Sequence, residues 1–378
     1  MHGIPVYLDC NATTPVEEEV IDAMTKALRE ELGNAGSRTH FYGAQAAQRV
    51  REAREQIAAV VDAEWDSIIL TSGATESNNL AILGLAEHAK RIGKTHIVST
   101  AIEHKAVLEP LAELGKRGFE VTLVSPNTSG YVSAEAVLKA VRDGTFLVSV
   151  MHVNNETGAI QPIAEIAKAL NSHPTILHTD SAQGYGKDLA PLRHPRIDLI
   201  SVSAHKVYGP KGIGALIRRN NARTERLAPL MWGGGQERGL RPGTIPVHLA
   251  IGFGEAARLA LEHHELRRQA CLQYRDKLLA ALSPLQPTLH GDLNSLLPNV
   301  INLRFGSLDS EAVMLALKDL VAISNGSACT SSSYGTSHVL TAMHLSDIEA
   351  NAATRWSWCH LTQHPNWSAV SERIQQLH

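Results

Sequence analysis

The segment IDLISVSAHKVYGPKG, residues 197–212, decides the predicted fold. Its first seven residues are rich in Ile, Leu and Val, which predicts a short buried strand. His205 and Lys206 follow that strand, and Gly209-Pro210 then favours a sharp turn. Lys206 is therefore expected at the carboxyl end of a strand, where open α/β sheets bind ligands. A solvated surface lysine is the alternative interpretation, because most lysines are surface charges.

Short apolar strands alternate with amphipathic helices on both sides of this segment. Apolar residues at helical spacing predict helices at 17–32, 45–61 and 74–92. Apolar and β-branched runs predict strands at 67–72, 96–100, 120–125, 146–153, 175–180, 197–203 and 212–219. Such alternation is typical of βαβ units, so we predict an α/β fold with a mostly parallel sheet.

The pattern changes in the last third of the chain. A glycine-rich loop at 232–244 is followed by one expected long helix over 246–283. Strands are then expected at 299–305, 322–325 and 353–358, which indicates a smaller α+β unit. We predict a large domain at residues 15–250, and a small domain formed by residues 1–14 together with 251–378.

Composition excludes several classes of protein. The 378 residues carry a net charge of -3, which gives no reason to expect direct nucleic-acid binding. No apolar run is long enough to span a membrane, and the first residues lack the pattern of a signal peptide. The four cysteines form no C-x-x-C pair, so a zinc site is not expected. With so few cysteines in the chain, we expect free thiols. We predict a cytoplasmic protein without a metal or a membrane span.

Polar residues that could bind a ligand end several of the predicted strands. The backbone N–H groups of Ala74 and Thr75 would face an anion at a helix N-terminus, unless this is ordinary helix capping. His104 could stack on a planar ligand or be a surface or helix-capping histidine. Asn155 could donate to a ligand oxygen or serve a turn. Asp180 would need a cation if it is buried, and helix capping is its alternative.

Three of these features together meet the needs of pyridoxal 5′-phosphate. This cofactor requires a lysine that forms a Schiff base, an acidic partner for its ring nitrogen and a phosphate-binding turn. Lys206, Asp180 and the turn at 73–75 supply all three in a parallel-sheet context. The sequence lacks a P-loop and a dinucleotide fingerprint, which disfavours nucleotide cofactors.

Two further residues are candidates for substrate chemistry. Cys329 lies in SNGSACTSSSYGTSHV, a stretch rich in Ser, Gly and Thr, where a loop-borne reactive thiol is expected. Arg355, in TRWSW, could bind a substrate carboxylate bidentately, and a surface ion pair is its alternative. Cys10, Cys271 and Cys359 are interpreted as structural, with Cys10 the least certain because its neighbours NATT resemble a site loop.

A family resemblance is carried by motifs along almost the whole chain. They include YLDCNATTP, TSGATESNNLA, EHKAVLEP, HVNNETGAIQPI, HTDSAQGYGK, SVSAHKVYGPKGIGAL, GGGQERGLRPGT, NGSACTSSS and TRWSW. The chain resembles a cysteine desulfurase of the fold-type I pyridoxal phosphate enzymes, within the class-V aminotransferases. NGSACTS resembles the group with an extended catalytic loop. The implied fold is a large domain with a seven-stranded sheet and a smaller α+β domain.

The resemblance implies a role for each matching residue. Lys206 would form the Schiff base, and His104 would stack on the cofactor ring. Asp180 would pair with the ring nitrogen, while Asn155 and Gln183 would contact the phenolic-oxygen side. The phosphate group would be held by Ala74, Thr75, Ser203 and His205, with Thr244 reaching the cofactor of a partner subunit. Arg355, with Asn155, would bind the substrate, and Cys329 would attack its sulfur.

The implied reaction removes sulfur from L-cysteine, leaving L-alanine and a persulfide on Cys329. The resemblance also implies a homodimer and a sulfur-acceptor protein, and His104 as an additional acid or base. Iron–sulfur assembly, tRNA thiolation and DNA phosphorothioation stay open as destinations of the sulfur. The alternatives are a related enzyme, such as a selenocysteine lyase or an aminotransferase, and a non-catalytic sulfur-transfer partner. Cys10 departs from the Asn or Tyr that the family often has there.

Overall fold

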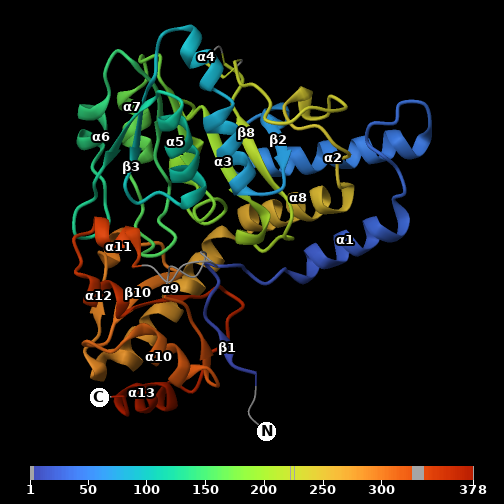
Figure 1. The fold of residues 1–378 in the computed structure, drawn as a ribbon. Coiled ribbons are helices and arrows are strands. Elements are labelled where there is room, and N and C mark those ends of the chain that lie inside the picture. Colours follow the sequence, from blue (N-terminus) through green and yellow to red (C-terminus); the bar gives the residue numbers. More distant parts are fainter. Residues whose placement is uncertain (1–3, 222, 225, 326–335, 378) are drawn as a thin grey trace.

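The core of the structure, a computed structural model, is a seven-stranded sheet (Figure 1). Residues 4–221, 223–224, 226–325 and 336–377 are described. The strand order is β2-β8-β7-β6-β5-β3-β4. The strands are β2 (Ile68–Thr71), β3 (His96–Thr100), β4 (Glu120–Val124), β5 (Thr145–Ser149), β6 (Ile176–Asp180), β7 (Leu199–Ser203) and β8 (Gly214–Arg218). Only β8 runs antiparallel to its two neighbours, so the predicted mostly parallel sheet is confirmed.

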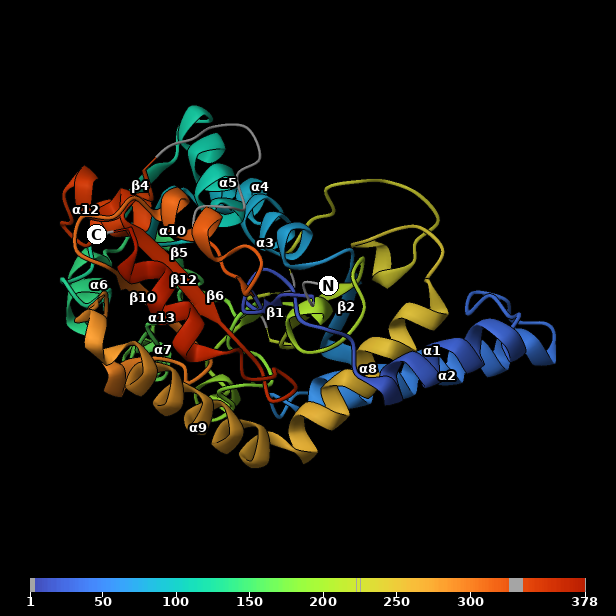
Figure 2. The same ribbon diagram turned by 90° about the horizontal axis from the view of Figure 1, so that it is seen from below.

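Helices cover both faces of this sheet, and each face has its own apolar core. One core joins α1 (Glu18–Glu30), α2 (Phe41–Ala59), α6 (Ala134–Ala140), α7 (Ile163–Ala169) and α8 (Val247–Glu262). The other core joins α3 (Ala74–Leu83), α4 (Ala86–Arg91) and α5 (Lys105–Lys116). Because both faces are covered, nearly every strand residue is buried, which explains their continuous apolar runs. Helices α1 and α2 project from the body beside α8 (Figure 2).

The helix expected over 74–92 is interrupted in the structure. It divides into α3 and α4 at Gly84, whose carbonyl accepts a 2.8 Å hydrogen bond from the backbone N–H of Ala228. A Cβ at Gly84 would lie 2.6 Å from the carbonyl oxygen of Ala228. The segment that contains Ala228 crosses close to the helix at this point and therefore requires a glycine at position 84. This requirement arises from tertiary structure, so the sequence pattern does not predict the interruption.

The helix expected over 246–283 is also two helices, α8 and α9 (His264–Leu282), which meet at His263. Helix α8 packs against α1 and α2, whereas α9 contributes Cys271, Tyr274 and Leu278 to a third apolar core. The break lies where the chain leaves one core for another.

The third core lies in the C-terminal part of the fold, together with the N-terminal strand. Strands β9 (Thr288–Leu289), β10 (Val300–Arg304) and β12 (Ala353–Ser357) form an antiparallel sheet, while β1 (Val6–Tyr7) pairs in parallel with β11 (Val321–Ala322). Helices α10 (Ser310–Leu317) and α13 (Trp367–Gln375) contribute to this core, whereas α11 (His338–Ala342) and α12 (Asp347–Asn351) contribute buried residues to the first core. The strand expected at 322–325 is thus shorter, and it pairs with β1. We propose that residues 1–14 and 251–378 form the small domain, a boundary that falls within α8.

Two features are absent from the described residues. Their helices include none long and apolar enough to cross a membrane. The described part of the chain likewise holds no group of three or more His, Cys, Asp or Glu side chains arranged to bind a metal ion.

One strand carries a histidine in the interior of the sheet. His178, in β6, pairs through Nδ1 with the hydroxyl of Ser149 at 2.8 Å and through Nε2 with that of Ser201 at 3.0 Å. Burial lowers the pKa of His178 to about 4.

We expect acid to destabilise the protein through this side chain. The unfolded histidine has a pKa of about 6.5, so the unfolded chain gains the proton first as the pH falls. Stability is therefore lost progressively between about pH 6.5 and pH 4, by on the order of 2 kcal/mol at pH 5 for this one residue. Urea unfolding at pH 7 and pH 5 measures the loss. His178→Gln should reduce the pH dependence, and the exposed-site control His344→Asn should not. An unchanged dependence in His178→Gln would exclude this residue as the cause.

Candidate active site

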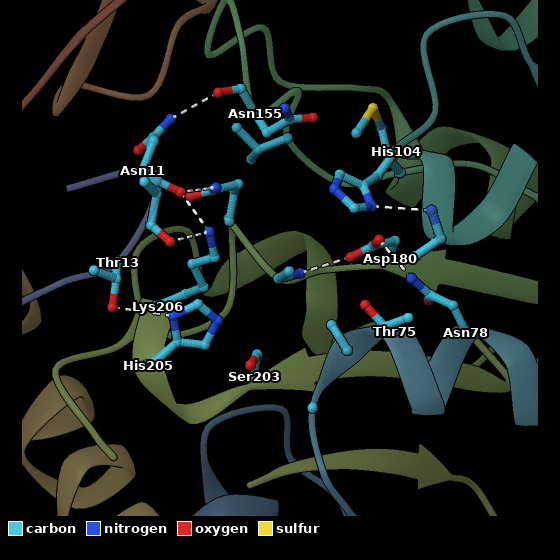
Figure 3. A pocket seen from close by; sticks show the side chains of 18 of the residues that line it. Asn11, Thr13, Thr75, Asn78, His104, Asn155, Asp180, Ser203, His205 and Lys206 are labelled. Atoms are coloured by element: carbon cyan, nitrogen blue, oxygen red, sulfur yellow. Dashed lines mark hydrogen bonds between the residues drawn. The ribbon is translucent and has the colours of Figure 1, made fainter. Parts of the chain in front are cut away.

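One cavity collects nearly all of the side chains singled out in the sequence. It has a volume of about 480 Å³ and lies at the carboxyl ends of β6 and β7, opposite the start of α3 (Figure 3). The predicted site residues that line it are Ala74, Thr75, His104, Asn155, Asp180, Gln183, Ser203, His205, Lys206 and Arg355. Parallel strands bring their carboxyl ends to one edge, which explains why segments far apart in sequence meet here.

Lys206 projects into the cavity from a short turn of 3₁₀ helix, Ala204–Lys206, that follows β7. Its Nζ donates hydrogen bonds to the backbone carbonyls of Asn11 and Ala12, the second at 2.8 Å. Figure 3 shows the amine directed toward the N-terminal segment. The surface-lysine interpretation is therefore wrong, because the side chain is partly buried and is aimed by two fixed acceptors.

The sequence did not predict the role of the N-terminal segment in the cavity wall. The carbonyl of Asn11 also accepts a 2.9 Å hydrogen bond from Gln183 Nε2, and its side-chain amide donates to the carbonyl of Asn155 at 3.2 Å. Asn11 thus connects three parts of the cavity wall. The available signal was the polar loop LDCNATTP, which resembled a site loop but gave no role to individual residues.

Asp180 ends β6 at the floor of the cavity. Its Oδ2 accepts a 2.7 Å hydrogen bond from Asn78 Nδ2, and its Oδ1 accepts one from the backbone N–H of Ala182 at 2.9 Å. Two donors hold the carboxylate in place, and the residue is only 5% exposed. A buried carboxylate so oriented can receive a further donor that carries positive charge.

His104 lies above Asp180 in Figure 3 and is held by the start of α5. Its Nδ1 accepts a hydrogen bond from the backbone N–H of Ala106 at 3.0 Å. Burial, with Lys206 as a second cause in the same direction, lowers the pKa of His104. The ring is therefore neutral near pH 7 and carries its proton on Nε2, because Nδ1 is the acceptor.

His205 is held in a similar neutral state beside Lys206. Burial and the charge of Lys206 lower the pKa of His205 to about 4. Its Nδ1 lies 3.2 Å from the hydroxyl of Thr13, another residue of the N-terminal segment. Near neutral pH this imidazole can donate one hydrogen bond without adding a second positive charge to the wall.

The turn before α3 forms an anion-binding cradle. Ala74 and Thr75 begin this helix, so their backbone N–H groups have no acceptor within it. Thr75 and Ser203 lie on neighbouring parts of the same wall in Figure 3. Gly214 of β8 makes the cradle possible, since a Cβ there would lie 2.7 Å from the Cα of Gly73. The arrangement offers N–H and O–H donors to a phosphate-sized anion.

Arg355, which belongs to strand β12, also lines the cavity. Its Nη2 pairs with Asp9 Oδ1 at 2.7 Å, and its Nη1 donates to the carbonyl of Asn155 at 3.0 Å. The residue is 1% exposed, so the alternative of a surface ion pair is wrong: an ion pair exists, but the guanidinium is buried. Asp9 is a further residue that the sequence analysis missed.

Three buried polar atoms of residues that line the cavity lack partners. Among the described residues, Asn78 Oδ1, Gln183 Oε1 and Arg355 Nε make no hydrogen bond. Burying such atoms unpaired is costly, so a ligand that supplies the missing partners would be stabilised.

The structure does not bring the last two predicted site residues into the described lining, for different reasons. Thr244 is exposed and is not part of the lining, so its contact with a partner subunit's cofactor stays a prediction. Cys329 lies outside the described residues.

Comparisons with known proteins agree with this geometry. Residues 6–364 match the aminotransferase class-V family. The cysteine desulfurase IscS of Vibrio cholerae serotype O1 is 45% identical over 362 residues, which cover 95% of this chain and 89% of that protein. A solved NifS-like protein superposes with a TM-score of 0.89 at 34% identity, covering 99% of this chain and 98% of that one. The structure of DndA from Streptomyces lividans superposes with a TM-score of 0.81 at 46% identity, covering 93% and 97%.

Proposed function

The chain belongs to the aminotransferase class-V family and is a cysteine desulfurase, and on this premise we propose that its cavity binds pyridoxal 5′-phosphate and L-cysteine. The observation that carries the proposal is that Lys206, Asp180 and the start of α3 line one cavity. An amine, a carboxylate and an anion cradle are the three groups that this cofactor requires.

The described residues fit the cofactor. We propose that Ala74, Thr75, Ser203 and His205 hold its phosphate group, as the donor-rich cradle supports. Asp180 would accept the proton of the ring nitrogen, His104 would lie against the ring face, and Gln183 and Asn155 would contact the phenolic oxygen. Bound in this way, the cofactor supplies a sink for the electron pair at the substrate α-carbon.

Lys206 has two tasks in this proposal. Its Nζ would hold the cofactor covalently, and as a free amine it would take and return the proton at the substrate α-carbon. The carbonyls of Asn11 and Ala12 support this assignment because they limit the directions in which the amine can point. His104, neutral with its proton on Nε2, would serve as an additional acid or base on the ring side.

Arg355 and Asn155 would position the substrate. The guanidinium binds the carboxylate of L-cysteine, and its unpaired Nε supports the presence of one further acceptor. Cys329 would attack the substrate sulfur as a thiolate. A bond then forms between the two sulfur atoms while the substrate Cβ–S bond breaks, so the products are a persulfide on Cys329 and L-alanine.

An activity measurement tests the proposal. Purified, cofactor-loaded protein should release alanine and sulfide from L-cysteine in equal amounts when a reductant is present. Alanine formation only with an added keto acid would instead indicate an aminotransferase, and preference for selenocysteine would indicate a lyase. Protein that binds no cofactor and turns over neither substrate would leave the non-catalytic partner as the better hypothesis.

Arg355→Lys should weaken substrate binding more than catalysis. Lysine keeps the charge but loses the planar fork, so we expect the KM for L-cysteine to rise by roughly tenfold or more with a smaller change in kcat. Steady-state kinetics give the two constants separately. The matched control is Arg304→Lys in the neighbouring strand β10, whose side chain pairs with Glu349. An unchanged KM in Arg355→Lys would contradict the assignment.

The remaining parts of the proposal concern partners and location. We propose a cytoplasmic homodimer that passes sulfur to an acceptor protein, with Thr244 reaching the neighbouring subunit's cofactor. Transfer of labelled sulfur to a captured acceptor would distinguish iron–sulfur assembly, tRNA thiolation and DNA phosphorothioation.

A further inference from the structure

Two buried thiols belong to chain segments that also contribute residues to the candidate active site. Cys10 and Cys359 pack together with Tyr208 in a small apolar cluster, and they are 1% and 2% exposed. The hydroxyl of Thr362 lies 4.0 Å from the sulfur of Cys10 and 3.5 Å from that of Cys359. Both thiols are free. The two residues are 349 positions apart in sequence, so only the fold brings them together.

The backbone fixes the two segments side by side. Asp9 and Ser357 form a parallel bridge, and the backbone N–H of Cys10 donates to the carbonyl of Ser357 at 3.1 Å. Cys10 is thus one position beyond the bridge and Cys359 two positions beyond it. A disulfide needs its two Cβ atoms about 4 Å apart, which adjoining segments in contact can reach with little movement.

The surroundings favour a thiolate at one of the two sulfurs. The hydrogen bond with Cys10, together with one from Thr362, lowers the pKa of Cys359, while the same contact and burial raise that of Cys10. The buried Nζ of Lys187 has no hydrogen-bond partner among the described residues, and negative charge on either sulfur would favour its ammonium form. A cysteine that only fills space has apolar neighbours and stays protonated. The Thr362 hydroxyl, 3.5 Å from the sulfur of Cys359, is a donor of the kind that favours a thiolate.

A small cavity adjoins Tyr208, the aromatic member of this cluster. A cavity of about 20 Å³, room for about one water-sized molecule, is lined by Tyr208, Lys187 and Cys271. Tyr208 is the same residue that packs against both sulfurs. Peroxide is close to this size, whereas a protein oxidant is not.

We propose that Cys10 and Cys359 are a modification site, a thiol pair that hydrogen peroxide converts reversibly into a disulfide. The sulfur of Cys359 attacks one peroxide oxygen, so an S–O bond forms and the O–O bond breaks, releasing one water. The sulfur of Cys10 then attacks that of Cys359, so the S–S bond forms, the S–O bond breaks and a second water leaves with the Cys10 proton. The two thiols lose two electrons, and peroxide gains them.

The disulfide would act on the two segments that hold the site. Cys10 directly precedes Asn11, whose carbonyl holds Lys206, and Cys359 follows the strand that carries Arg355. Asn11 is attached to the second segment by a 2.9 Å hydrogen bond from its backbone N–H to the hydroxyl of Ser357. Oxidation would therefore shift the acceptor of the lysine relative to the proposed carboxylate site.

The test uses the full-length, cofactor-loaded protein with Cys329→Ser, so that the proposed nucleophile cannot react. The protein is treated with peroxide, alkylated and digested, and its peptides are weighed before and after dithiothreitol. We expect a reducible peptide pair joining Cys10 to Cys359, and a fall from three alkylatable thiols to one. The visible circular dichroism of the bound cofactor should change on oxidation and return on reduction.

Single substitutions provide the controls. Cys10→Ala and Cys359→Ala should each abolish the linked peptide and the spectral change, whereas Cys271→Ala, which removes the third buried thiol, should keep both. Thermal unfolding of the reduced variants checks that each is folded. A protein that shows no linked peptide, or one that joins Cys271, overturns the proposal. The readouts need no turnover, so they stand apart from the desulfurase assay.

Discussion

Lys206→Ala is expected to lose desulfurase turnover by at least about three orders of magnitude, because it removes both the covalent attachment and the proton carrier. The structure gives the reason for so large an effect. The amine is aimed into the cavity by the carbonyls of Asn11 and Ala12. Borohydride reduction followed by mass spectrometry detects the covalent adduct, and alanine release measures turnover.

Lys206→Arg is the matched control for this prediction. Arginine keeps the positive charge and can donate to the same two carbonyls, but it cannot form a Schiff base. We therefore expect the arginine variant to be as inactive as the alanine variant. A borohydride-reducible adduct in Lys206→Ala would show that another amine carries the cofactor, and an active Lys206→Arg would show that charge alone suffices.

Cys329→Ala is expected to abolish persulfide formation and to reduce sulfide release from L-cysteine by about a hundredfold or more. Cofactor binding should be unchanged, because Cys329 is not among the residues that we propose to hold the cofactor. Transfer of labelled sulfur from L-cysteine to the protein measures the persulfide, and visible absorbance reports the cofactor.

Cys271→Ala separates this effect from a general loss of thiols. Cys271 is buried in α9 within the third apolar core, so its substitution should leave the labelled persulfide intact. Full persulfide transfer in Cys329→Ala would show that another residue is the nucleophile, and the related-enzyme hypothesis would then gain support.

The sheet and much of the cavity lining could be predicted because their signals are local. Strands such as β3 and β6 are buried on both faces, so their apolar runs are visible in the sequence without knowledge of their neighbours. A polar residue that follows such a run, as Lys206 does, must lie at the same edge of a parallel sheet as the polar residues that follow the other strands. The position of a site residue then follows from its place at the end of a strand.

What could not be predicted depends on contacts between distant segments. Asn11 contributes a backbone carbonyl, a group that every residue has, so its sequence carries no mark of this role. The breaks at Gly84 and His263 arise where another segment crosses or where the chain changes core, and helical periodicity continues through both. The pairing of β1 with β11 joins chain positions about 315 residues apart, which no local pattern encodes.

The attachment of the N-terminal segment to β12 has a consequence for the order of folding. Both acceptors of the Lys206 amine belong to residues 11–12, and these are fastened by Ser357, which is 346 residues from Asn11. A ribosome must therefore release Ser357 before the lysine is held in place. Closing so long a loop is slow compared with forming the sheet. The central sheet can assemble early, but the ability to bind a cofactor is acquired last, when the segments around Asn11 and Ser357 meet.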